Sequence, residues 1–200
     1  MPTLSKVNAK KCVTKSTFSP PLIDTYNLFY MGNEYMADIK LSNEVDENGF
    51  NFVLTKNGDT VFGKIKADTG LQAAPIKLST GVQNADGKGY GLKHIEANHG
   101  DQIRNAGFHS VAEFVEYVAK NYTTIKIGNK RGLNSTYLLE LEVEDRHNNT
   151  IFIEWSWAGY WNINSAGIFN KRYSIKKKVI WTLPAVSNGA DANTKEVNHG

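Results

Sequence analysis

The chain has 200 residues, a formal net charge of +3 at pH 7 and a hydrophobic fraction of 40%. This length suits one well-formed core rather than two, and this composition is ordinary for a globular protein, so disorder is not the default expectation. The single cysteine, Cys12, excludes an intrachain disulfide and a cysteine-based zinc site.

No stretch approaches the roughly 18 consecutive apolar residues of a membrane-spanning helix, and the start of the chain lacks the apolar segment of a signal peptide. We therefore expect a cytoplasmic protein with no membrane contact. Residues 1–21 are rich in Lys, Ser, Thr and Pro and predict a flexible leader, and the polar residues 185–200 predict a disordered tail. Residues 22–184 are then one domain.

Short strands are expected in the first part of this domain. Between residues 22 and 59, apolar clusters alternate with the turn dipeptides Asn48-Gly49 and Asn57-Gly58, which favours hairpins. Residues 61–65 and 75–78 are further β-like runs. The glycine-rich loop 84–91 could cradle an anion in front of a helix, or it could be a plain connector, since it matches no phosphate-binding motif.

Two helices follow. The first is predicted from residue 92 to 99, with Gly100 as its C-terminal stop. The second begins at Ser110, which has Glu113 at capping-box spacing, and ends near residues 120–121. One face of it is an apolar stripe at helical spacing, formed by Val111, Phe114, Val115 and Val118.

After residue 122 the hydrophobic period changes to two. Strands are predicted at residues 137–143, 150–157, 160–169 and 178–183, joined by short turns. In the second of these, Trp155 and Trp157 share a face with Ile151 and Ile153, which favours core packing. The sequence therefore predicts the α+β class, with a helix pair followed by an antiparallel β-meander.

Two histidines stand close together on the first helix. His94 and His99 are five residues apart, about 140° around an α-helix, so one regular helix cannot present both to a single metal ion. His99 falls on the inward stripe with Leu92, Ile95 and Ile103 and is expected to be a partly buried core histidine. His94 falls on the flank, where it could be an acid–base group or an ordinary surface residue.

Three segments carry a family resemblance. The chain resembles the phage-type barnase/EndoU/colicin/RelE-like nucleases of bacterial mobile elements, in versions from Bacteroides-type genomes, over residues 91–108, with their Gly-Leu-x-His-Ile-x-x-x-His pattern, over the helix of residues 110–122 and over residues 161–169. The resemblance covers about residues 61–184. It implies a barnase/RelE-like fold whose sheet has a concave face that holds RNA.

The resemblance also implies a site. His94, His99 and Ser165 are the catalytic candidates, and neither a metal nor another cofactor is expected. The chain departs from better-known members in having Asn162 and Asn164 on the late strand and no obvious catalytic Glu paired with the histidine. Asn164 is taken as a substrate-binding residue.

Basic and aromatic residues complete the expected RNA site. Lys93, Arg131, Lys171 and Arg172 could meet the phosphate, although each could also be a solvated surface charge. Tyr173 and Tyr160 could stack on bases, and residues 176–178 could contact phosphates or keep a sheet edge soluble.

The resulting hypothesis is a metal-independent endoribonuclease of phage, mobile-element or toxin type that leaves 2′,3′-cyclic phosphate ends. RNA is its expected partner and a protein inhibitor a possible one, with the oligomeric state left open. The alternatives are a catalytically inactive module that binds nucleic acid or protein, and a structural accessory domain of a phage particle.

Overall fold

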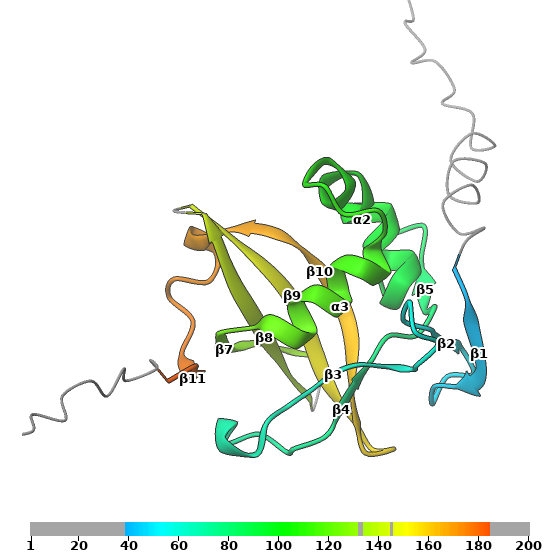
Figure 1. The fold of residues 1–200 in the computed structure, drawn as a ribbon, viewed down its shortest axis with the longest axis horizontal. Coiled ribbons are helices and arrows are strands. Elements are labelled where there is room, and N and C mark those ends of the chain that lie inside the picture. The colour runs from blue at the N-terminus through cyan, green and yellow to red at the C-terminus, as the bar shows by residue number, and fades with distance from the viewer. Residues whose placement is uncertain (1–38, 132–133, 145, 185–200) are drawn as a thin grey trace, which may run out of the picture.

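The structure is a computed structural model that describes residues 39–131, 134–144 and 146–184 (Figure 1). The predicted leader and tail lie outside these residues. The central element is a seven-stranded sheet with the order β11-β7-β8-β9-β10-β4-β3. Its strands are β3 (Val61–Lys64), β4 (Pro75–Lys77), β7 (Thr124–Arg131), β8 (Asn134–Glu144), β9 (His147–Ser156), β10 (Tyr160–Asn170) and β11 (Val179–Thr182).

The remaining elements are short hairpins and helices. β1 (Leu41–Val45) pairs with β2 (Asn51–Val53), and β5 (Val82–Gln83) pairs with β6 (Gly89–Tyr90). The helices are α2 (Gly91–Asn105) and α3 (Val111–Asn121), with single 3₁₀ turns at η1 (Ala67–Thr69) and η2 (Lys171–Tyr173).

The predicted fold class is wrong. The described part of the chain is mostly β, and its sheet is mixed, because β4 runs parallel to β10 with Trp161 opposite Ile76. Strands β3 and β4 precede the helices in sequence and yet extend the sheet that follows them. Alternation along a segment can predict a strand, but it does not say which distant strand it pairs with. The antiparallel meander was therefore inferred from neighbouring strands alone, and the barnase/RelE-like fold was expected from the family resemblance.

Helix α3 follows its sequence signals. The Ser110 hydroxyl accepts a hydrogen bond from the Glu113 N–H at 3.1 Å, and the Glu113 carboxylate accepts one from the His109 N–H at 2.7 Å. These bonds satisfy amide groups that a helix start leaves without partners.

Helix α2 runs past Gly100, which was predicted to end it. Gly100 lies inside the helix, where a Cβ would come within 2.4 Å of the Glu96 carboxylate and 2.7 Å of the Arg104 guanidinium. Those two side chains form an ion pair at 2.8 Å across the glycine. The helix instead ends before Gly107, whose φ of +94° is the left-handed conformation that glycine tolerates best.

The core lies between the helices and one face of the sheet. α3 contacts the edge strand β3 and also β8 and β9, so the sheet curls around this helix (Figure 1). The apolar stripe of α3 and the facing sheet side chains are fully buried, including Phe114, Val118, Leu139, Ile153 and Ile163.

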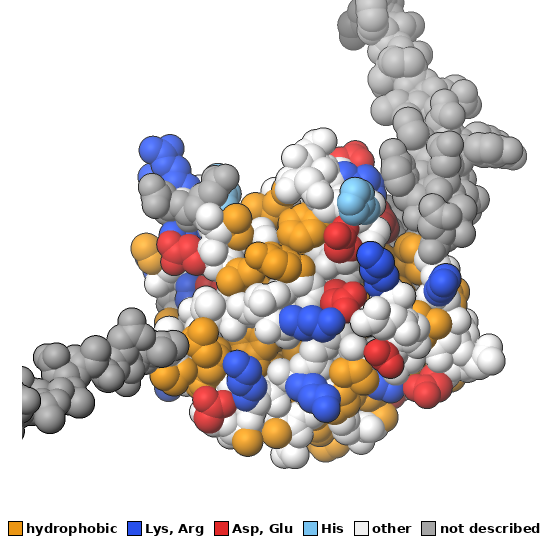
Figure 2. Space-filling model, in the orientation of Figure 1, with side chains coloured by type: hydrophobic (Ala, Val, Ile, Leu, Met, Phe, Trp, Pro, Cys, Tyr) orange, Lys and Arg blue, Asp and Glu red, His pale blue; other side chains and the backbone are white. Residues whose placement is uncertain are grey.

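The surface on the helix side has no dominant charge. Among the described residues drawn there, Lys and Arg side chains are interspersed with Asp and Glu (Figure 2). Within the same described residues, no helix is long and apolar enough to cross a membrane.

Two aromatic predictions are wrong. Trp157 is not in the core but is 85% exposed, because it lies in the turn after β9, where strand alternation no longer applies. Tyr160, expected to be available for stacking, is buried and packs edge-on against Phe52, with ring centroids 5.4 Å apart. Trp155 packs against Trp161, as core packing predicts.

Candidate functional site

The face of the sheet opposite α3 carries two cavities of about 210 Å³ each. We call the first the imidazole cavity; it is lined by His99, Asn129, Thr136, Leu138, Phe152, Asn164, Ser165, Phe169, Tyr173 and Lys177. We call the second the carboxylate cavity; it is lined by Asp46, Glu47, Asn48, Gly89, Tyr90, Asn134, Glu154, Trp155, Ser156, Tyr160, Asn162 and Asn164. Asn164 lines both, so the two cavities are neighbours along β10.

Helix α2 reaches this face across an incomplete edge of β10. Strand β4 pairs only with Trp161 and Asn162, so the rest of β10 has no strand on that side. The Gln102 amide takes the place of a strand there, because its Nε2 donates to the Ile168 carbonyl at 2.8 Å and its Oε1 accepts from the Ile168 N–H at 3.2 Å. This two-point contact fixes α2 to the strand and sets the position of His99, one turn earlier.

The imidazole of His99 lies directly on β10. Its ring meets the Phe169 ring at a centroid distance of 5.2 Å, and Gly167 leaves the space that the imidazole occupies. Burial lowers the pKa of His99 below the usual 6.5, and the hydrogen bond with Gln102 opposes this shift in part. A neutral imidazole at pH 7 can accept a proton, which is what a general base needs.

Gly167→Ala should displace the His99 imidazole from its packed position on β10. A Cβ at position 167 would lie 3.0 Å from both Cγ and Nδ1 of His99, closer than packed carbons approach. We expect the displaced ring to gain solvent and the pKa of His99 to rise toward 6.5. Histidine titration followed by NMR measures this shift, with the His94 signal as the internal control. An unmoved His99 titration would show that Gly167 does not hold the ring in place.

A β-bulge brings Asn164 and Ser165 into the same cavity. Ile163 is opposite Ile153 and Ser165 is opposite Phe152, so β10 has one extra residue at Asn164. Neighbouring residues of a regular strand point to opposite faces, whereas a bulge changes the direction of a side chain. Here both side chains line the imidazole cavity. Asn164 is only 6% exposed, and its Oδ1 accepts from Asn162 Nδ2 at 3.4 Å.

The far wall of the imidazole cavity supplies a cation and an aromatic ring. The Lys177 ammonium donates to Asn129 Oδ1 at 3.1 Å and lies 5.4 Å from the centre of the Tyr173 ring. Tyr173 also packs against Phe169, with ring centroids 5.3 Å apart. Tyr173 also meets Phe152 edge-on, with ring centroids 6.0 Å apart, and it remains 49% exposed.

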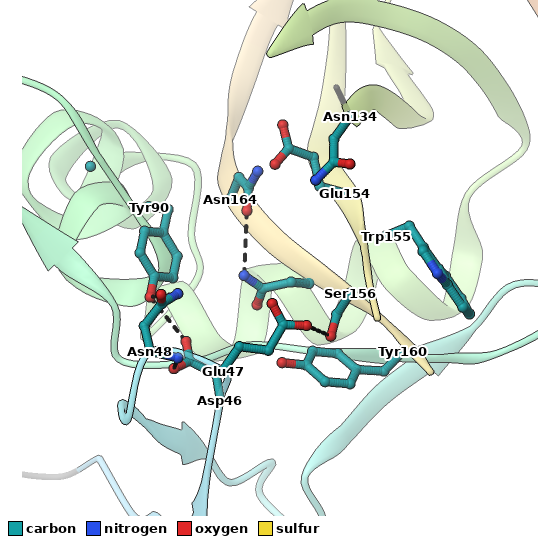
Figure 3. A pocket seen from close by; sticks show the side chains of 12 residues that line it. Asp46, Glu47, Asn48, Tyr90, Asn134, Glu154, Trp155, Ser156, Tyr160 and Asn164 are labelled. Atoms are coloured by element: carbon teal, nitrogen blue, oxygen red, sulfur yellow. Dashed lines mark hydrogen bonds between the residues drawn. The ribbon is translucent and has the colours of Figure 1, made fainter. Parts of the chain in front are cut away.

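The carboxylate cavity has the opposite electrostatic character. It is lined by three carboxylates and by no Lys, Arg or His. Asp46 is structural: it accepts hydrogen bonds from the Asn48 and Phe50 N–H groups and from the Tyr90 hydroxyl, and burial raises the pKa of Tyr90 to about 12. Glu47 accepts from the Ser156 hydroxyl, and Glu154 lies near Asn134 and Asn164 (Figure 3).

The structure separates the predicted site residues into two groups. His99, Ser165, Asn164 and Tyr173 meet in the imidazole cavity. His94 lines neither cavity; its Nδ1 lies 2.7 Å from Gln83 Oε1 on the other flank of α2, next to an exposed Lys93.

Lys171 and Arg172, two of the other predicted phosphate ligands, also lie outside both cavities. The Lys171 ammonium pairs with Glu142, and Arg172 is exposed on η2. Arg131 ends β7, and its side chain lies outside the described part of the structure. The glycine-rich loop forms the β5–β6 hairpin, and the first N–H groups of α2 already donate to Ser79 and Thr80 carbonyls, which leaves them unavailable to an anion.

Sequence reasoning missed several polar residues of this face, among them Glu47, Asn129 and Glu154. Glu154 was a detectable case, since it alternates with Ile153 and Trp155 and so had to face away from the core. Glu47 and Asn129 come from a turn and a strand far away in sequence, and no local pattern brings them together. Among the described residues, no group of three His, Cys, Asp or Glu side chains is placed to hold a metal ion.

The comparisons with known proteins add no relatives. No protein-family model matches the chain, and neither a curated protein nor a solved structure matches it.

Proposed function

We propose that this chain is a metal-independent endoribonuclease whose reaction takes place in the imidazole cavity. The observation that supports this best is the meeting of one half-buried imidazole, one buried amide and one ammonium group in a single cavity: His99, Asn164 and Lys177. Cleavage of RNA by its own 2′-hydroxyl needs a base, a group that meets the phosphate charge, and a source of a proton. A cytoplasmic setting is part of this proposal.

The proposed reaction assigns one step to each group. His99 takes the proton of the ribose 2′-hydroxyl, and the 2′-oxygen attacks the adjacent phosphorus while the bond from phosphorus to the 5′-oxygen breaks. The Lys177 ammonium and the Asn164 amide stabilise the negative charge that builds on the phosphate. The Tyr173 hydroxyl is the proton donor for the leaving 5′-oxygen. The products are a 2′,3′-cyclic phosphate and a free 5′-hydroxyl.

Lys177 and Asn164 are suited to this role by their surroundings. Asn164 is held by the bulge and by Asn162, so its amide does not need to reorganise when charge develops. No described residue accepts a hydrogen bond from Asn164 Nδ2, which leaves this donor for a ligand. Lys177 is positioned by Asn129 and Tyr173 rather than by a carboxylate, so its charge is not already neutralised.

The test is turnover in the presence of a chelator. Purified full-length protein incubated with a mixed-sequence RNA and EDTA should give fragments that end in 2′,3′-cyclic phosphate. The same reaction with Lys177→Gln should be slower, and with Lys93→Gln it should be unchanged, because Lys93 lies outside both cavities. RNA that is bound but left intact would contradict the proposal and favour a nucleic-acid-binding module.

A further inference from the structure

We propose that Lys126 and Ser174 are positioning residues that hold Lys177 at the imidazole cavity. This inference rests on the proposed function, because Lys177 is the ammonium group assigned there to the phosphate. The segment concerned is residues 171–178, which we call the crossing segment; it leads from the end of β10 to β11 (Figure 1). Since β9, β8 and β7 lie between those two strands in the sheet, the crossing segment has to span them. Two of its side chains, Tyr173 and Lys177, line the cavity.

A buried ion pair lies in the sheet under the crossing segment. Lys126 Nζ on β7 is 2.7 Å from Glu140 Oε2 on β8, and the two side chains are only 14% and 5% exposed. Lys126 is opposite Leu138, which lines the imidazole cavity, so the ion pair belongs to the same face of the sheet as that cavity. Neither member of the pair lines the cavity itself.

Ser174 connects this ion pair to Lys177. The Lys126 ammonium donates a hydrogen bond to the Ser174 hydroxyl at 3.0 Å. Ser174 is 2% exposed, whereas its neighbours Tyr173 and Ile175 are exposed, so Ser174 is the residue of this turn that faces the sheet. The Ser174 carbonyl in turn accepts a hydrogen bond from the Lys177 N–H at 2.9 Å. The backbone position of Lys177 therefore depends on where Ser174 is fixed.

The other contacts of the Lys177 side chain are with exposed residues. Its ammonium donates to Asn129 at 3.1 Å and lies 5.4 Å from the centre of the Tyr173 ring, and both of these partners are exposed. Contacts between exposed polar side chains contribute little order, because both partners lose conformational entropy when they are held together. Loss of the Ser174 contact should therefore be enough to displace the Lys177 ammonium.

The chemistry of the ion pair favours positioning over stabilisation. Burying an ammonium and a carboxylate costs solvation energy that their attraction often does not exceed, so an apolar pair of similar size can stabilise a sheet equally well. An ammonium has three donors, however, and those of Lys126 reach both Glu140 and Ser174. Asn148 Nδ2 donates to the same Glu140 oxygen at 3.1 Å, which holds the carboxylate in place. An apolar pair could not bind the Ser174 hydroxyl in this way.

A double-mutant cycle of Ser174→Ala and Lys177→Gln tests the proposal. In the full-length protein with RNA and EDTA, Ser174→Ala should lower kcat/KM at least about tenfold, since a misplacement of about 1 Å can cost about 10²-fold. In the Lys177→Gln background the same substitution should cause no further loss, because the group that Ser174 positions is already absent. Ser79→Ala is the matched control and should leave cleavage unchanged. Ser79 is a fully buried serine that lines neither cavity, and its hydroxyl has no hydrogen-bond partner among the described residues.

A second variant removes the other end of the contact. Lys126→Met combined with Glu140→Gln replaces the ion pair with an apolar chain and a neutral amide, so that no buried charge is left without a partner. Ser174 is unchanged in this variant but loses its donor. Cleavage should fall to the same extent as in Ser174→Ala. The melting temperature should stay close to that of the wild type, because a buried ion pair contributes little net stability.

An NMR readout needs no RNA. The Lys177 ammonium lies over the Tyr173 ring, so cross-relaxation between the Lys177 Hε protons and the ring protons of Tyr173 reports the position of Lys177. This contact should be lost in Ser174→Ala and in the Lys126→Met, Glu140→Gln variant. It should be kept in Ser79→Ala.

The outcomes separate the two proposals. An unchanged rate in Ser174→Ala, an equal loss in both backgrounds, a fully active Lys126→Met, Glu140→Gln variant or a retained NMR contact each overturns the positioning role, even if RNA is cleaved. If the wild type leaves RNA intact, the endoribonuclease proposal fails, and the NMR contact alone then decides whether Lys126 and Ser174 hold Lys177 in place.

Discussion

His99→Ala should lower kcat/KM for RNA cleavage by about 10²–10⁴-fold, the usual contribution of a general base. His99 is the imidazole of the cavity, and its ring rests on Gly167 and Phe169 next to Ser165. Thermal unfolding of the same variant separates chemistry from folding: a loss of activity with an unchanged melting temperature assigns His99 to the reaction.

His94→Ala is the matched control, because it removes the same side chain from the same helix. His94 lines neither cavity, so this variant should cleave RNA at close to the wild-type rate. A large loss of cleavage in His94→Ala together with an active His99→Ala would mean that His94 is the acid–base group, as the sequence suggested.

The pH profile gives a second readout of His99. The general base must be neutral, and burial holds the pKa of His99 below 6.5. The value of kcat/KM for cleavage should therefore rise with pH, with a midpoint below 6.5, and should be level near pH 7. This midpoint reports the free enzyme, because kcat/KM does so. A rate that falls as pH rises through this range would mean that His99 acts as an acid.

The two histidines show how far a helical pattern can be used. The helical spacing correctly placed His99 on the inward stripe of α2, since Leu92, Ile95 and Ile103 of that stripe are fully buried. It suggested a structural role for His99 because an inward side chain was assumed to meet the hydrophobic core. The stripe in fact extends over the unpaired edge of β10, and this edge depends on where β4 stops, which periodicity along α2 cannot predict.

The strands show the same limit. Alternation predicted β8, β9 and β10, and the turn dipeptide Asn48-Gly49 predicted a hairpin where β1 pairs with β2. The mixed sheet was missed because β4 pairs with a strand more than 80 residues later in the chain. The bulge at Asn164 was missed too, and it is what brings two consecutive side chains into the candidate site. Pairing and bulges are set by packing between distant segments, so the candidate site could be predicted only in part.

Phe114→Ala should lower the free energy of unfolding by about 3–5 kcal/mol, the usual range for removing a buried Phe ring. Phe114 is fully buried in the stripe of α3, and its ring meets the Phe108 ring at a centroid distance of 5.1 Å. The sheet curls around this helix, so the surrounding strands cannot close the space without moving their own backbone pairings. Chemical denaturation measures the change.

Tyr117→Ala is the matched control for Phe114→Ala. Tyr117 is an aromatic residue one turn later on α3, but it is 46% exposed and contacts Phe108 from the outer side. Its removal should cost about 1 kcal/mol or less, because a partly solvated ring leaves no closed cavity. Equal losses of unfolding free energy in the two variants would mean that burial of the apolar stripe does not determine how strongly α3 contributes to stability. A large loss of unfolding free energy in Phe114→Ala alone would show that the sheet stabilises α3 by packing against this apolar stripe.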